Sequence, residues 1–128
     1  MVAGAYRVGY VTTLLGGRRH FSKAVTSEDS WIRSAAERQM VNYRVQSSAA
    51  EQTKLAIGRL WVDGTYRRSD VTFYAPLHDE VIQSVPTETA AEVGTVIREV
   101  MEQQYADMIV PMKSTAEWGP NFGEQIYP

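Results

Sequence analysis

The stretch VTFYAPLHDEVIQSV, residues 71–85, places the charged tripeptide His78-Asp79-Glu80 between two short apolar runs. In residues 71–77 every second residue is apolar, which predicts a half-buried strand. Residues 81–85 are expected to return as its partner. Pro76 cannot donate a ladder hydrogen bond, so the first strand should lie at a sheet edge or bulge there. We therefore predict a hairpin whose turn carries one imidazole and two carboxylates. For the tripeptide alone, a solvated acidic turn is the favoured interpretation.

Helical spacing is found on both sides of this predicted hairpin. A first helix is expected over residues 28–43. Ser48-Ala49-Ala50-Glu51 matches a capping box and is expected to start a second helix, which ends near Gly64. Thr89-Ala90-Ala91-Glu92 is expected to cap a third helix in the same way. The three predicted apolar stripes are Ile32, Ala36, Met40 and Tyr43; Ala49, Thr53, Ala56, Ile57 and Leu60; and Val93, Val96, Ile97, Val100, Met101 and Tyr105.

Short extended segments are expected near both ends of the chain. Residues 8–15 read as extended chain, Gly16-Gly17 as a turn, and residues 109–116 as a last short strand, whereas residues 1–8 show no clear pattern. Together these elements predict an α+β fold, with a small antiparallel sheet backed by helices in a single domain over residues 1–128.

Composition narrows the class of protein. The chain has 128 residues, 44% hydrophobic and 22% charged, which fits one domain with a real core. It has no cysteine, so disulfides and thiolate metal sites are excluded. No apolar run could span a membrane and no signal-peptide pattern is present, so we expect no membrane partner and a cytoplasmic location.

Charge is divided unevenly along the chain. Residues 1–77 hold 11 Lys/Arg and 6 Asp/Glu, whereas residues 78–128 hold 2 and 9. A basic half can contact phosphates and an acidic half can hold cations, although a chance division of a solvated surface explains the asymmetry equally well.

A row of polar side chains suggests nucleic-acid binding. Arg38, Asn42 and Gln46 are four residues apart and so share one helix face. Such a row could follow a duplex minor groove, where every base pair presents acceptor atoms. By spacing alone, a solvated polar face is the commoner outcome. Arg18 and Arg19 follow the predicted turn and could bind backbone phosphates, or they could simply be an exposed basic turn.

The order of these segments is similar to one family of enzymes. Thr13-x-x-Gly16-x-Arg18-Arg19, then Glu37-Arg38-x-x-x-Asn42-x-x-x-Gln46, then His78-Asp79-Glu80, resembles the C-terminal palm of family A (polymerase I-like) DNA polymerases, especially the phage branch. The chain departs from the family pattern at Gly17, where a third basic residue is usual, at Ser47-Ser48 for Gly-Thr, at Glu51 for Asp, and at Pro76 for Gln.

The resemblance implies a role for each matching residue. Asp79 matches the metal-binding catalytic aspartate, Glu80 a supporting carboxylate near the metals, and His78 a histidine that contacts the primer terminus. Arg18, Arg19, Arg38, Asn42 and Gln46 match DNA-contacting positions. The reaction is template-directed nucleotidyl transfer in DNA replication, with deoxynucleoside triphosphates as substrates and two Mg²⁺ ions. Asp79 and Glu80 would be this chain's Mg²⁺ ligands.

The same resemblance indicates missing parts. A second catalytic aspartate and the fingers helix have no match in this chain, so we expect a split or truncated polymerase, completed by a companion polypeptide that carries both, and inactive alone. The alternatives are a non-catalytic DNA-binding or scaffold module derived from a palm, or a piece of a longer chain. Other chemistries fit less well: two histidines without cysteine argue against zinc, and neither a nucleophile elbow nor a phosphate-binding glycine loop is present.

Overall fold

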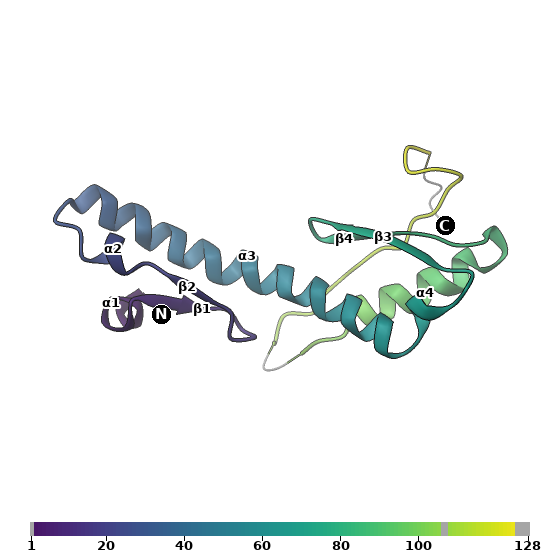
Figure 1. Ribbon diagram of the computed structural model, residues 1–128, viewed down its shortest axis with the longest axis horizontal. Coiled ribbons are helices and arrows are strands. Elements are labelled where there is room, and N and C mark those ends of the chain that lie inside the picture. The colour runs from purple at the N-terminus through teal and green to yellow at the C-terminus, as the bar shows by residue number, and fades with distance from the viewer. Residues whose placement is uncertain (1, 106–107, 125–128) are drawn as a thin grey trace. The chain divides into compact units, whose positions relative to one another are not determined.

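The computed structural model describes residues 2–105 and 108–124, which form two compact units, Met1–Glu51 and Gln52–Pro128. The boundary falls inside the long helix α3 (Ser30–Val62), which contributes to both units (Figure 1). Each unit holds one two-stranded antiparallel sheet. The predicted α+β class is confirmed, with two small sheets in place of the single one expected. None of the described helices is both long and apolar enough to cross a membrane.

The first unit is built around a short hairpin. Helix α1 (Val2–Val8) precedes strand β1 (Tyr10–Thr12), which pairs with β2 (Arg18–His20), and α2 (Ser22–Val25) leads toward α3. Gly16 adopts a φ of +90° in the connecting turn, a conformation that glycine reaches without strain. The unit's buried core consists of Ala5, Val11, Phe21, Val25, Ala36 and Met40. The turn at Gly16-Gly17 is confirmed, whereas the helix in the first eight residues was not foreseen.

Helix α3 corrects the prediction of two separate helices. It runs unbroken for 33 residues from Ser30, where Asp29 Oδ1 accepts a hydrogen bond from the Trp31 amide at 2.7 Å. Ser48 therefore does not cap a helix. Its hydroxyl instead donates to the Arg44 carbonyl one turn earlier, at 2.5 Å, within the continuous helix. The two predicted stripes are confirmed in part, because each contributes to the core of a different unit: Ala36 and Met40 are buried in the first and Ala56 and Leu60 in the second. Ile32 and Ala49, which had been expected in the stripes, are exposed.

The second unit contains the predicted central hairpin. Strands β3 (Thr72–Leu77) and β4 (Glu80–Ser84) pair antiparallel, with an irregularity between Phe73 and Ala75. Pro76 lies in an edge strand, as expected, but it pairs in register with Val81 and is not at the irregularity. The 3-10 turns η1 (Thr65–Arg67) and η2 (Thr87–Thr89) flank this hairpin, and helix α4 (Ala90–Glu102) follows. The core joins α3, the hairpin and α4 through Ala56, Leu60, Tyr66, Val71, Val93, Ile97 and Val100.

Two sequence expectations in this unit were wrong. Thr89 does not form a capping box, because its hydroxyl donates to the Pro86 carbonyl and Glu92 pairs with Arg68. Residues 109–116 form no strand. An added Cβ at Gly94 of α4 would lie 3.2 Å from the Ala116 side chain and 3.8 Å from Trp118, so this segment lies directly against the helix instead of in a sheet.

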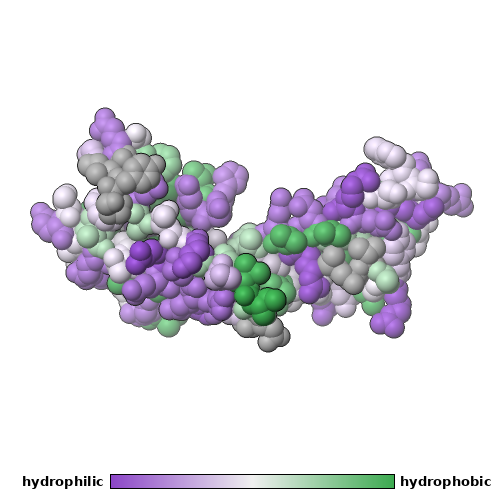
Figure 2. Space-filling model, turned by 180° about the vertical axis from the view of Figure 1, so that it is seen from behind, coloured by the Kyte–Doolittle hydropathy of each residue, from purple (hydrophilic) through white to green (hydrophobic). Residues whose placement is uncertain are grey.

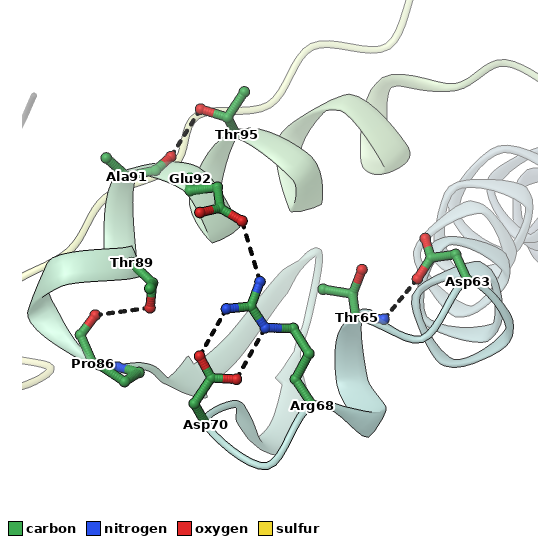
Figure 3. A network of polar contacts seen from close by, with 9 residues as sticks. All are labelled: Asp63, Thr65, Arg68, Asp70, Pro86, Thr89, Ala91, Glu92 and Thr95. Carbon is green, nitrogen blue, oxygen red and sulfur yellow. Dashed lines mark hydrogen bonds and ion pairs between the residues drawn. The ribbon is translucent and has the colours of Figure 1, made fainter.

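An ion-pair network links the segment before β3 to helix α4. The Arg68 guanidinium lies between two carboxylates, 2.7 Å from Asp70 and 3.2 Å from Glu92 of α4 (Figure 3). Its hydrogen bonds hold the pKa of Asp70 below the usual value. Because these groups are partly exposed, we regard the network as fixing local geometry more than adding stability.

Candidate functional site

The tripeptide His78-Asp79-Glu80 lies at the tip of the β3–β4 hairpin. Leu77 pairs with Glu80, which leaves His78 and Asp79 as a two-residue turn. All three side chains of the tripeptide are exposed. In the described part of the chain, none of them has a hydrogen bond or ion pair within the protein. The predicted position is therefore confirmed, and the turn offers a free imidazole and two free carboxylates.

His78 has an unusual backbone conformation. Its φ of 56° is positive, which is true of no other non-glycine residue described here. A two-residue hairpin turn with positive φ at its first position alone has the φ pattern of type II′, which prefers glycine there. Such a conformation costs about 1–3 kcal/mol, and such residues cluster at functional sites. Histidine at this position therefore adopts a backbone conformation that glycine would adopt at lower energetic cost.

The base of the hairpin is anchored by stacked aromatic rings. Tyr66 of η1 stacks on Phe73 of β3, with ring centroids 4.9 Å apart, and meets Trp61 of α3 edge-on at 5.9 Å. Its hydroxyl lies 3.4 Å from Gln83 Oε1 of β4. Burial, with a smaller contribution from Asp63, raises the pKa of Tyr66 to about 12. The phenol thus stays protonated and ties both strands to the core of the second unit.

The hairpin tip carries two carboxylates that are candidates for metal binding. Across residues 2–105 and 108–124, no three His, Asp or Glu side chains lie close enough together to hold one metal ion. Carboxylate oxygens are the ligands that Mg²⁺ prefers. Asp79 and Glu80 therefore fit a hard cation by their chemistry, and further ligands would have to be added to them.

The polar row of α3 lies in the first unit. Arg38, Asn42 and Gln46 are all exposed, and within the described chain their side chains make no hydrogen bond or ion pair. Every donor and acceptor in the row is thus available to a ligand. Beside the row, Val41 and Val45 are also exposed.

The structure separates the two arginines that the sequence interpretation had grouped together. Neighbouring residues of a strand point to opposite faces. The Arg18 guanidinium lies 5.0 Å from the ring centre of Tyr10 on β1. The Arg19 guanidinium instead lies 5.0 Å from the ring of Phe21 and 5.6 Å from that of Tyr43 on α3. Arg19 is therefore held against α3, while Arg18 faces away with Tyr10.

The β1–β2 turn is fastened to α3 by residues that the sequence interpretation did not assign to the site. The Thr13 hydroxyl donates to Glu51 Oε1 at 2.8 Å, and the Leu14 amide donates to Ser48 Oγ at 3.0 Å. Glu51 Oε1 also lies 2.3 Å from the point where a Cβ on Gly17 would stand. Three departures from the family pattern, at Gly17, Ser48 and Glu51, thus meet at one turn. Those departures were the signal in the sequence that could have identified this contact.

Comparison with known proteins gives a consistent result. The model of a protein family described as DNA polymerase family A matches residues 1–124. DNA polymerase I of Geobacillus stearothermophilus is 36% identical over 122 residues, which are 95% of this chain and 14% of that protein. The thermostable DNA polymerase I of Thermus thermophilus is 32% identical over 114 residues, 89% of this chain and 13% of that protein.

Solved structures agree with these sequence relatives. One similar structure is the POL domain of Pol1 from M. smegmatis in complex with DNA primer-template and dNTP. It has a TM-score of 0.77 and 29% sequence identity, and the match covers 88% of this chain and 19% of that chain. The chain thus spans only a small part of the proteins that it matches.

Proposed function

Because this chain belongs to DNA polymerase family A, we propose that it supplies one part of a DNA-directed DNA polymerase. In this proposal it contributes one metal-binding aspartate and primer–template contacts to nucleotidyl transfer, as a partial palm over residues 1–128. The observation that carries the proposal is the hairpin tip, where a free imidazole and two free carboxylates stand at an exposed turn. The match over residues 1–124 supports treating both units as one functional piece.

Each residue of the tip has a distinct proposed task. The Asp79 carboxylate binds a divalent cation, for which Mg²⁺ is the best chemical fit, and Glu80 supports the same site from the first position of β4. Such ions, when bound, stabilise the charge that develops on the phosphoryl oxygens. The His78 ring donates a hydrogen bond to the primer end, and its strained backbone at the turn fixes where that donor stands.

The first unit is proposed to hold the primer–template duplex. Arg38, Asn42 and Gln46 present free donors and acceptors along one helix face, which suits the acceptor atoms of a minor groove. Arg18 and Arg19 bind backbone phosphates, and the aromatic rings beneath them reduce the freedom that each guanidinium loses on binding. Because they face opposite ways, they contact different phosphates.

A companion polypeptide completes the proposed enzyme. It would carry the fingers, the second catalytic aspartate and the binding site for the incoming deoxynucleoside triphosphate. The two-stranded β3–β4 sheet supports this part, because in the described chain its outer edges pair with no other strand and Tyr74 and Leu77 are exposed. A phage-like origin and a cytoplasmic location also remain part of the proposal.

Single-turnover incorporation by the reconstituted complex tests the catalytic role. Asp79→Asn should abolish extension while leaving primer–template affinity within about twofold, because a metal ligand acts mainly on the transition state. Glu99→Gln removes an equal charge from an exposed site on α4 and serves as the matched control. If Asp79→Asn incorporates nucleotides at a near-normal rate, the catalytic role fails, and a non-catalytic DNA-binding module becomes the better interpretation.

A further inference from the structure

Two exposed valines border the polar row of α3. Val41 is 47% exposed and Val45 is 66% exposed. They follow Arg38 and Asn42 by three residues each, so they lie beside these side chains on the helix surface. Together with Glu37, these four residues line a shallow, open hollow on the surface of α3. On the face shown in Figure 2, exposed hydrophobic surface is bordered by hydrophilic surface.

The unpaired polar groups around the hollow favour a nucleic acid as its occupant. Arg38 and Asn42 have no partner within the described chain. Glu37 keeps its negative charge, but its Oε1 accepts the Tyr6 hydroxyl at 2.6 Å, so Arg38 is the charged group of the lining that has no partner. The core of a protein interface is normally depleted of charged residues, which this lining is not. A polyanionic strand with apolar sugar faces satisfies both the free cation and the valine methyl groups.

We propose that Val41 and Val45 make this surface selective for deoxyribose, an inference that rests on the proposed DNA-binding role of α3. The minor groove of a duplex that contains RNA displays 2′-hydroxyl groups, which allow a protein to distinguish RNA from DNA. The valine methyl groups can contact a deoxyribose ring but can neither donate to nor accept from a hydroxyl. A 2′-hydroxyl held against them loses its water without gaining a partner.

The test separates the hydroxyl from the shape of the groove. Fluorescence anisotropy would measure the affinity of the full chain for two duplexes of one sequence, each with one DNA strand. The second strand is ribose in one duplex and 2′-fluoro in the other, which keeps a ribose-like sugar pucker without the hydroxyl. We expect the chain to bind the 2′-fluoro duplex at least about fivefold more tightly. An all-DNA duplex at the same salt concentration serves as the reference.

Substitutions test whether Val41 and Val45 cause the preference for the duplex without 2′-hydroxyl groups. The double substitution Val41→Thr/Val45→Thr keeps the side-chain shape, and a threonine oxygen can accept from a 2′-hydroxyl even while it donates to the preceding turn. It should reduce the preference to below about twofold, because affinity for the ribose duplex rises by more than affinity for the all-DNA duplex falls. Val62→Thr, at a position 79% exposed on the same helix and outside the hollow, should leave the preference intact.

Each other outcome is decisive. If the chain binds DNA but shows no preference, or if the threonine variant retains it, the selectivity inference is overturned while the proposed DNA contacts stand. If the companion polypeptide abolishes the preference while DNA binding persists, the hollow is a protein contact and the inference is also overturned. If the chain binds none of the duplexes, the proposed DNA-binding role fails, and the inference fails with it.

Discussion

Replacing Gly17 by alanine should destabilise the first unit by way of Glu51. The added Cβ would lie 2.3 Å from Glu51 Oε1 and 3.0 Å from Thr13 Oγ1, so the carboxylate has to move. Moving it breaks the 2.8 Å hydrogen bond from Thr13. The other oxygen, Glu51 Oε2, is buried and has no hydrogen-bond partner in the described chain, so it does not offset the loss of the bond from Thr13.

The expected magnitude follows from two opposing contributions. A hydrogen bond to a charged group contributes about 1.5–3 kcal/mol. Alanine in place of glycine lowers the entropy of the unfolded chain, which stabilises the fold by about 0.4–1 kcal/mol. Gly17→Ala should therefore lower the free energy of unfolding by about 1–2 kcal/mol. In urea this corresponds to a midpoint that is lower by roughly 0.5–1 M.

Urea denaturation followed by circular dichroism would measure this change. Gly58→Ala is the matched control, because nothing lies within 4 Å of the added Cβ and the residue is inside α3. It should stabilise the chain by about 0.5–1 kcal/mol. In a Glu51→Ala background, Gly17→Ala should cost almost nothing. An equal cost with and without the Glu51 carboxylate would refute the reasoning, because the two sites would then be independent.

Three further predictions concern the hairpin tip, the polar row and the ion-pair network. His78→Gly should raise the free energy of unfolding by about 1 kcal/mol through relief of the positive φ, yet weaken retention of the primer end; a lower stability in urea would contradict the turn assignment. Arg38→Ala should reduce the slope of log affinity against log salt by about 1, whereas Arg98→Ala should not; equal slopes would remove Arg38 from the DNA contacts. The lowered pKa of Asp70 stabilises the fold above its unfolded pKa, so this stabilisation by Arg68 should be lost as pH falls through the folded pKa. Acid titration of the unfolding free energy should therefore be flatter for Asp70→Asn, and an unchanged slope would contradict this role.

Much of the second unit was determined by its local sequence. Alternating apolar residues, an interrupting Pro76 and a charged tripeptide were enough to predict the hairpin and to place His78-Asp79-Glu80 at its turn. Gly64 ended the preceding helix region as expected, with a φ of +96°. These features depend on preferences within a few residues, which a sequence displays directly.

Other features depended on contacts between distant residues. The apparent break at Ser48 came from two apolar stripes that contribute to different cores, whereas the structure shows one continuous helix from Ser30 to Val62. Burial by α4 likewise kept residues near Ala116 out of a sheet. A local pattern gives the period of a stripe, but it does not identify the element that the stripe packs against.

The candidate site also has features set by local sequence and features set by contacts between distant residues. The sequence by itself determined which residues could carry the chemistry, since spacing gave the row that starts at Arg38 and the motif gave Asp79. The tertiary structure decided how they are held. It turned Arg19 toward Tyr43 and Arg18 toward Tyr10, and it joined Gly17 to Glu51 across 33 intervening positions of the chain. The physical reason is that side-chain identity is local, whereas the direction and partners of a side chain depend on residues that only folding brings together.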